Sequence, residues 1–411
     1  MASILVAGGS LGGLMVANML LRDGHDVRVL EKAPGSLDGR GAGIVTHKHL
    51  VEGLLRAGLD ADASLGVAVP GRVLLDAQGE VQTAFDLPQV LTSWSRLYSL
   101  LFGIFPRERY VQPATVKEVR AEPAGVTVRC GSQELRADLL IASDGIRSAV
   151  RQQLAPHIQP QYAGYVAWRG VCDEAVLSRG TREMVFERFA FGLPAGEQLI
   201  AYPVAGPGHA LEVGQRSYNV VWYRPANASE LRTLLTDADG DYHAAGIPPN
   251  KVSWRAVAAM RTAARELLAP QFAEIMEKTA QPFLQAIYDV SSERIAFDRV
   301  ALMGDASFVA RPHVGAGVTK AAEDAMALSD AIRAHGATPT ALAAYETERL
   351  KVGQAIVERG RRLGGYLQAY SGGARRARSA SENIDVARDT AIELEGFTVQ
   401  DLLSVRGAQQ D

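Results

Sequence analysis

The stretch "ILVAGGSLGGL", Ile4 to Leu14, decides the fold because it joins a short apolar run to a glycine-rich turn. Apolar residues at helical spacing follow over residues 11–23, and "DVRVLE" at 26–31 alternates as a strand does. A strand, a glycine-rich turn, a helix and a second strand within about thirty residues form the βαβ unit that opens dinucleotide-binding domains. The N-terminus is therefore predicted to be such a unit.

The glycine-rich turn differs in one place from the fingerprint G-x-G-x-x-G. Gly8 and Gly13 take the first and third glycine positions, and Ser10 takes the second. Serine is small and its hydroxyl can donate to a phosphate, so we expect the loop to bind a nucleotide. Glu31 ends the second strand, where a carboxylate accepts hydrogen bonds from a ribose diol. The alternative is a glycine-rich packing turn that binds nothing.

Two later apolar runs also end at acidic residues. "ADLLIAS" at 137–143 precedes Asp144, and "RVALMG" at 299–304 precedes Asp305. Loops after parallel strands meet at the carboxyl edge of a sheet, where ligands bind. After Asp305 the chain reads "ASFVARPHVGAG" and opens a helix, whose free N–H groups and positive dipole end form an anion site.

Between the last two of these runs the pattern changes to short β-like segments, such as "GYVAWRGV" (164–171), "QLIAYPV" (198–204) and "YNVVWY" (218–223). Clustered strands predict a separate antiparallel sheet. After Gly317 the pattern is helical, with a long helix from about Pro339 to Tyr370, a flexible link at 371–385 and a short terminal amphipathic segment.

The predicted fold class is therefore α/β, with a Rossmann-like nucleotide-binding domain, an inserted antiparallel-sheet substrate domain and C-terminal helices. We assign residues 1–71, 99–154 and 296–336 to the nucleotide domain, 72–98 and 155–295 to the substrate domain, and 337–411 to the C-terminal helical segment.

The composition is that of an ordinary globular protein. Among 411 residues, 47% are hydrophobic and 22% charged, and the net charge of −3 implies neither nucleic acid nor a membrane surface as a partner. Two distant cysteines form no disulfide framework, and no signal peptide or spanning helix is evident, so we expect a cytoplasmic protein, with a homodimer left open. The eight histidines show no metal-ligand spacing with acids, so no metal site is expected.

The ordered motifs "GGSLGG" at the N-terminus, "SDGIRSAVR" at 143–151 and "GDASFVARPHVGAG" at 304–317 resemble those of the class A flavoprotein monooxygenases, the FAD-dependent aromatic hydroxylases. The resemblance spans residues 4 to about 365. It implies that the nucleotide domain binds FAD without a covalent link. It also implies reduction by NADH or NADPH, reaction with O₂ to a flavin C4a-hydroperoxide, and transfer of one oxygen to an electron-rich ring. Only one fingerprint is present, so the nicotinamide cofactor is expected to bind transiently.

The resemblance implies a set of FAD-contacting residues, most of them within the three motifs. They are Gly8, Gly9, Ser10, Leu11, Gly13, Glu31, Lys32, Gly43, Val116, Asp144, Gly304, Asp305, Pro312, Gly315, Ala316, Gly317 and Val318. Gly43 belongs to "GAGI" at 41–44, which resembles the family's mobile loop beside the flavin. The chain departs from the family at Phe308, Thr319 and Trp94, where His, Asn and Arg are usual, and Arg96 follows two residues after Trp94.

Two histidines are candidates for assisting deprotonation of a hydroxylated ring, which makes the ring a better nucleophile. His313 follows Pro312 in the flavin loop, and His47 follows the "GAGI" loop. Histidine suits this role because its pKa lies near neutrality. Each histidine has a packing or surface role as its alternative.

Three aromatic residues on the predicted antiparallel sheet, Trp168, Tyr202 and Tyr223, are candidates for the wall of the substrate pocket, with core packing as the alternative. The stretches "YAGYVAWRG", "LIAYP" and "RPHVGAG" resemble the hydroxypyridine hydroxylases of the family more than its phenolic-acid enzymes. We therefore expect a hydroxypyridine-like substrate. A phenolic acid is the alternative, with Arg169 or Arg311 as the carboxylate clamp.

Three other readings remain open. A flavin halogenase usually has W-x-W-x-I-P, which "AWRGV" does not match. A flavin reductase would oxidise NAD(P)H without consuming O₂. A non-catalytic FAD-binding protein would show no substrate-stimulated turnover.

Overall fold

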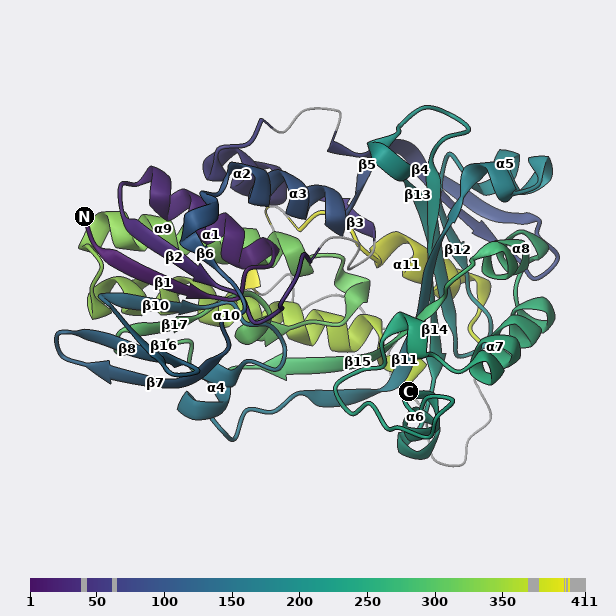
Figure 1. Cartoon of the computed structure of the whole chain (residues 1–411). Helices are drawn as coiled ribbons and strands as arrows, with labels where there is room; N and C mark the ends of the chain where they lie inside the picture. The colour runs from purple at the N-terminus through teal and green to yellow at the C-terminus, as the bar shows by residue number, and fades with distance from the viewer. Residues whose placement is uncertain (38–42, 61–64, 369–376, 395, 397, 400–411) are drawn as a thin grey trace.

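Three segments far apart in the sequence form the centre of a parallel sheet, at the left of Figure 1. They are β1 (Ser3–Ala7), β10 (Leu139–Ala142) and β17 (Val300–Leu302), which match the three predicted apolar runs. β10 pairs in parallel with both β1 and β17, and β2 (Asp26–Leu30) pairs in parallel with the other side of β1. The sheet is completed by β6 (Tyr110–Val111), which is parallel to β2, and by β16 (Ala296–Phe297), an edge strand antiparallel to β17. This order confirms the Rossmann-like part of the predicted fold.

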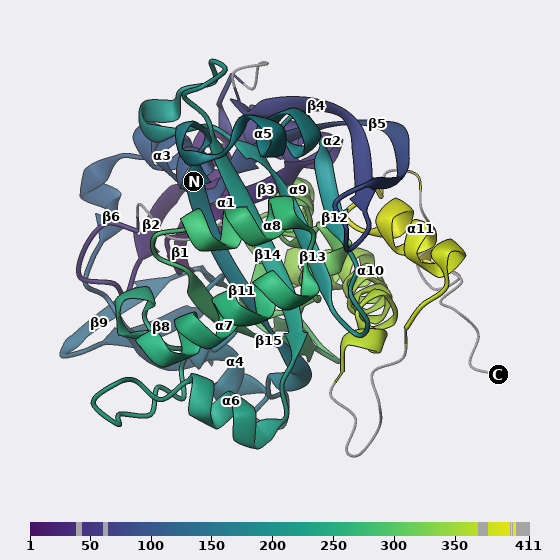
Figure 2. The same ribbon diagram turned by 90° about the vertical axis from the view of Figure 1, so that its right-hand side faces the viewer.

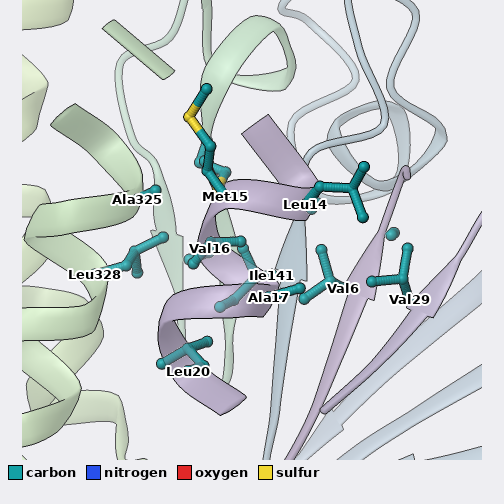
Figure 3. Close-up of a cluster of buried hydrophobic side chains, with 14 of the residues drawn as sticks. Val6, Leu14, Met15, Val16, Ala17, Leu20, Val29, Ile141, Ala325 and Leu328 are labelled. Atoms are coloured by element: carbon teal, nitrogen blue, oxygen red, sulfur yellow. The ribbon is translucent and has the colours of Figure 1, made fainter. Parts of the chain in front are cut away.

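Helices cover this sheet and supply most of its core. The helix α1 (Leu11–Arg22) places Leu14 and Ala17 near Val6 of β1, while Ala325 and Leu328 of α9 (Gly317–His335) approach from beyond α1 (Figure 3). All of these side chains are buried, which accounts for the mainly apolar sequence of α1. The neighbouring helices are α2 (Lys48–Ala57), α3 (Trp94–Ile104), α9 (Gly317–His335) and α10 (Pro339–Leu363).

A second sheet of nine strands lies beside the first, at the right of Figure 1. In spatial order it contains β18 (Phe308–Val309), β15 (Phe283–Ser291), β11 (Gln161–Asp173), β14 (Ser217–Pro225), β13 (Gln198–Val204), β12 (Phe189–Gly192), β4 (Val67–Leu75), β5 (Val81–Ser93) and β3 (Gly43–Thr46). Its pairings are antiparallel except for the parallel pair of β12 and β4. The sheet includes β3 and β18, which come from segments that we assigned to the nucleotide domain.

The two faces of this sheet have different neighbours. The helices α7 (Trp254–Leu267) and α8 (Pro270–Lys278) cover one face, which is turned toward the viewer in Figure 2. The opposite face contacts the segment around residue 313 and the C-terminal part of the chain. The smaller elements are α4 (Ala149–Leu154), α5 (Arg179–Val185), α6 (Ala228–Leu234) and a sheet of β7 (Val116–Glu122), β8 (Gly125–Cys130) and β9 (Gln133–Ala137).

The C-terminal region differs from the prediction in two ways. The helix α10 ends at Leu363, before the predicted end at Tyr370. A further helix, α11 (Ala380–Asp389), begins inside the stretch that we expected to be a flexible link. Its start is fixed by a capping box, in which the Ser379 side chain and the Glu382 side chain each accept a hydrogen bond from the other's backbone N–H. This Ser-x-x-Glu signal was present in the sequence.

This computed structural model describes residues 1–37, 43–60, 65–368, 377–394, 396, 398 and 399. Among those residues no helix is both long and apolar enough to span a bilayer. The same residues contain no cluster of three or more potential metal ligands. Cys130 and Cys172 are free thiols, and burial raises the pKa of Cys172 to about 12.

Candidate active site

The turn after β1 has the close packing that the fingerprint requires. A Cβ atom on Gly8 would lie 2.3 Å from the Ser143 carbonyl oxygen, and one on Gly13 would lie 1.9 Å from the Gly8 carbonyl oxygen. Ser10 is the N-cap of α1, and its side chain makes no capping hydrogen bond. The helix therefore begins with uncapped N–H groups directly after a tight glycine turn, which is the arrangement that binds a pyrophosphate.

Glu31 is buried and holds this turn in place. Its Oε2 accepts a hydrogen bond of 2.8 Å from Gly9 N–H, and its Oε1 accepts one of 2.8 Å from Ala33 N–H. Tyr110, which sequence reasoning missed, donates from its hydroxyl to the Gly9 carbonyl over 3.1 Å. A Cβ atom on Gly9 would lie 2.2 Å from that hydroxyl, so this position also requires glycine. Glu31 thus organises the loop, in addition to its predicted role toward a ribose.

The loop after β10 is anchored by Asp144 and Arg151. Asp144 Oδ2 accepts from the Ala149 N–H at 2.7 Å, while its buried Oδ1 has no partner among the described residues. Burial raises the pKa of Asp144, although its hydrogen bonds oppose the shift. Arg151 is wholly buried and donates to the Ala306 carbonyl over 2.8 Å, which ties this loop to the one after β17. Sequence reasoning had not singled out Arg151.

The loop after β17 rests on a buried charge network. The Gly304 N–H donates to Asp324 Oδ2 over 3.0 Å, and Lys320 Nζ donates to the Gly304 carbonyl over 2.8 Å. Arg349 Nε donates to Asp324 Oδ1 over 2.9 Å. Burial alone would raise the pKa of Asp324, but Lys320 and Arg349 lower it overall. Asp305 lies beside this network and is exposed at the surface of the loop. The surrounding protein atoms still reduce the hydration of its carboxylate, and this desolvation raises its pKa.

The predicted flavin loop turns sharply into α9. Gly315 has φ of +70°, a left-handed conformation that favours glycine, and Ala316 is the N-cap of α9 without a side-chain cap. The first turn of α9, which includes Val318, holds no acidic residue, and a Cβ atom on Gly317 would meet nothing within 4 Å. This uncapped helix start beside open space suits a group that becomes negatively charged.

His313 lies at the centre of the aromatic face of the nine-stranded sheet. It is wholly buried, its Nε2 lies 2.9 Å from the Tyr165 hydroxyl, and its ring centroid lies 4.4 Å from that of Tyr223. Burial, assisted by the charge of Arg311, lowers the pKa of His313 to about 3. The expectation of a near-neutral pKa is therefore not met, because burial disfavours the charged form of this imidazole. Arg311 itself forms a buried ion pair with Asp289 at 3.0 Å.

His47 connects the start of α2 with the first turn of α9. Its Nδ1 lies 3.1 Å from the Thr319 hydroxyl, and burial lowers its pKa. Thr319 thus contacts His47 at the position where the family usually has Asn. Gly43 begins β3, and its N–H donates to Asn219 Oδ1 over 3.1 Å. Gly41 and Ala42 of the predicted mobile loop lie outside the described residues.

Two of the three predicted wall residues share one face of the nine-stranded sheet. Tyr202 stacks on Phe189 at 4.9 Å between ring centroids, and both belong to the same hydrophobic cluster as Tyr223. The prediction for Trp168 as a third residue of this wall is wrong. Trp168 lies on the opposite face, in the cluster with Trp222 and the helices α7 and α8, because side chains alternate along β11.

The remaining predicted FAD residues lie near the nucleotide turn. Leu11 is buried at the start of α1, Lys32 is exposed directly after Glu31, and Val116 is buried at the start of β7. The Ala114 N–H donates to the Glu31 carbonyl over 2.7 Å, which brings the segment before Val116 beside the turn. Arg96, on α3, has a buried Nε without a partner among the described residues.

Comparisons with known proteins show the family of the chain. Residues 162–289 match a family model described as FAD binding domain-like. The chain is 31% identical over 368 residues to the 2,6-dihydroxypyridine 3-monooxygenase of Paenarthrobacter nicotinovorans, covering 89% of this chain and 91% of that protein.

Solved structures extend the likeness to the fold. The 2,6-dihydroxypyridine-3-hydroxylase from Arthrobacter nicotinovorans superposes with a TM-score of 0.83 at 29% identity, over 92% of this chain and 98% of that chain. The Klebsiella pneumoniae protein HpxO, complexed with FAD and uric acid, shares the fold with a TM-score of 0.75 at 21% identity, over 98% and 97% of the two chains. Identity along nearly the whole length of a curated relative shows that the protein belongs to the class A flavoprotein monooxygenases, the FAD-dependent aromatic hydroxylases.

Proposed function

We propose that this protein hydroxylates a small hydroxylated pyridine, using bound FAD, transiently bound NADH or NADPH, and O₂. One oxygen atom would enter the ring ortho or para to an existing hydroxyl. The observation that carries the proposal is the aromatic face around His313, where neutral hydrogen-bonding groups lie buried beside the flavin loop.

The residues at the sheet edge suit FAD. The turn from Gly8 to Gly13 would hold the pyrophosphate, Glu31 the adenosine ribose, and Asp305 the ribityl region. The unpartnered Oδ1 of Asp144 and the uncapped start of α9 offer further contacts. When bound, FAD supplies the oxidation and reduction chemistry with nicotinamide and O₂ that side chains lack.

His313 would orient the ring through a hydrogen bond. Tyr165 occupies Nε2, and the buried Nδ1 has no partner among the described residues. With Nε2 protonated, Nδ1 is free to accept the hydrogen of a ring hydroxyl, which raises electron density on the ring. Its low pKa means that His313 polarises this hydroxyl without keeping the proton.

The aromatic face also offers a neutral donor and excludes water. The Asn219 amide nitrogen is buried without a partner among the described residues, so it could donate to a ring nitrogen or carbonyl. Tyr202 and Tyr223 are both buried, and burial raises the pKa of Tyr202 to about 12. These groups carry no charge at neutral pH, which suits a neutral heterocycle.

Arg169 supports a phenolic acid as the second candidate. Its Nε is buried without a partner among the described residues, and its charge acts on Tyr202 and Tyr223. An arginine in this position could bind a carboxylate. One of its terminal nitrogens already donates to Gln285 over 2.8 Å, which leaves it less free to form the bidentate pair that a carboxylate prefers.

The test is a substrate screen with the purified holoprotein. NAD(P)H oxidation, O₂ consumption and product mass are measured with 2,6-dihydroxypyridine, salicylate and 4-hydroxybenzoate. We expect stimulation by the pyridine and a product heavier by about sixteen mass units, the mass of one oxygen atom. Tight coupling with a benzoate and none with a hydroxypyridine would refute the pyridine assignment. NAD(P)H oxidation without O₂ consumption would instead indicate a flavin reductase.

A further inference from the structure

Arg72 is a buried arginine whose side chain forms most of its hydrogen bonds with the C-terminal segment at residues 387–391. It lies on β4, is wholly buried, and sits over the rings of Phe189 and Phe191. Its guanidinium donates to four backbone carbonyls at the end of α11 and just beyond it: Ala387 at 2.6 Å, Thr390 at 2.6 Å, Ala391 at 3.0 Å and Arg388 at 3.4 Å. Figures 1 and 2 both show α11 beside the nine-stranded sheet.

This arrangement is costly for a charged group. Burial lowers the pKa of Arg72 to about 9, and no carboxylate of the described residues lies within ion-pair distance. Desolvating a cation without an ion-pair partner is unfavourable, and here carbonyl dipoles, two aromatic faces, the Gln89 side chain and the more distant charge of Asp389 offset the loss. Detaching the segment that supplies these carbonyls would leave the cation buried without compensation, which is strongly unfavourable.

The segment that Arg72 holds touches the flavin loop. The Ala391 N–H donates to the His313 carbonyl over 2.8 Å. A Cβ atom on Gly315 would lie 2.6 Å from the Ala391 Cβ, so only glycine allows this approach. Ala391 itself has φ of +53°, a conformation that residues other than glycine rarely adopt unless their surroundings enforce it.

The same segment reaches two more parts of the site. Glu393 Oε2 accepts from the Lys48 N–H over 2.8 Å, at the start of α2 beside His47. Gln89 on β5 donates to the Ala391 carbonyl over 2.9 Å and accepts from Arg72 over 2.9 Å. Residues 387–393 therefore join the nine-stranded sheet, the flavin loop and α2.

We propose that Arg72 is a positioning residue for hydroxylation, which fixes His313 and Gly315 through residues 387–391. The inference rests on the proposed function, because it assigns the consequence to the same site. Loss of Arg72 would free the segment and loosen the loop beside the flavin. FAD would still be held by the N-terminal turn around Gly8, whose hydrogen bonds run to Glu31 and Tyr110 and not to Arg72. Oxygen transfer depends on a closed, well-oriented site, so reducing equivalents would be lost as hydrogen peroxide.

The experiment compares the holoprotein with Arg72→Met, Arg72→Lys and, as a matched control, Arg261→Met. Arg261 also donates to a backbone carbonyl, that of Thr279 at 3.0 Å, but it lies on α7, on the other side of the sheet. FAD content, hydrogen exchange of peptides covering 387–394, and product and peroxide formed per NAD(P)H are measured. For Arg72→Met we expect exchange at least about tenfold faster and coupling lowered about threefold or more, with FAD content unchanged.

Arg72→Lys is expected to recover part of the coupling, because its ammonium group can still donate to some of the carbonyls. If Arg72→Met does not fold, Gln89→Leu removes one of the contacts to Ala391 and is expected to change exchange and coupling in the same direction by less. Exchange or coupling equal to wild type in the folded variant overturns the inference. A wild-type protein without hydroxylation refutes the proposed function instead, and hydrogen exchange then still decides whether Arg72 holds residues 387–391.

Discussion

Replacing Glu31 by Gln is expected to destabilise the protein without FAD and to weaken FAD binding. The carboxylate accepts from the Gly9 N–H and the Ala33 N–H, both at 2.8 Å. A glutamine oxygen can accept from one of these groups, but its NH₂ would face the other donor. Losing one charge-assisted hydrogen bond lowers the free energy of unfolding by about 1.5 to 3 kcal/mol. FAD, which must then order the turn, would bind up to about 10- to 150-fold more weakly.

The assay pairs denaturant unfolding of the apoprotein with titration of FAD followed by flavin fluorescence. Arg28→Gln, at an exposed position on the same strand, is the control and should match wild type in both measurements. If Glu31 acts only on the ribose, FAD affinity alone will fall and the apoprotein will unfold as wild type does. That outcome would refute the inference that Glu31 organises the turn.

Three further predictions concern single positions around the site. Because the Ser10 side chain makes no capping hydrogen bond, Ser10→Gly should keep FAD affinity, whereas Ser10→Val should reduce it in the same titration by crowding the phosphate. His313 has a folded pKa of about 3 against an ordinary value of 6.5, so its stabilising contribution is full above pH 6.5 and is lost as the pH falls toward 3. Unfolding at stepped pH should therefore show a steeper acid loss for wild type than for His313→Gln, and equal slopes would contradict the burial argument. Tyr165→Phe removes the hydroxyl 2.9 Å from His313 Nε2 and should cost about 1 to 3 kcal/mol in denaturant unfolding, with FAD content retained.

The architecture was largely predictable because its signals are local. The segment predicted at 198–204 coincides with β13, and the runs before Asp144 and Asp305 became neighbouring parallel strands. Alternation along β11 showed which residues share a face, but not which face meets the flavin loop. The assignment of Trp168 failed for that reason, since the choice of face depends on where α7 and α8 pack.

Much of the candidate site depends on contacts that leave no local pattern. The sequence around Arg72 does not differ from that of an ordinary strand. The carbonyl groups that accept from Arg72 lie more than 300 positions later in the chain. Tyr110 and Arg151 likewise act through backbone atoms of distant loops. Two signals were available in the sequence. One is the capping box that starts α11, and the other is the separation of four residues between Lys320 and Asp324, which places the two charges on one turn of α9, where they form a buried ion pair.

The order of strands in the parallel sheet also governs when the protein can acquire its cofactor during synthesis. β1 leaves the ribosome first, but its partner β10 follows more than 130 residues later, and β17 about 160 residues after that. The loop after β17 is held by Asp324, which is itself held by Arg349, so the nucleotide cradle is complete only when nearly the whole chain has been translated. Until β10 has been synthesised, the apolar edge of β1 on that side stays unpaired, and an unpaired strand edge favours wrong pairing in the nascent chain. FAD can therefore be bound in full only near the end of synthesis, after the nine-stranded sheet has been translated.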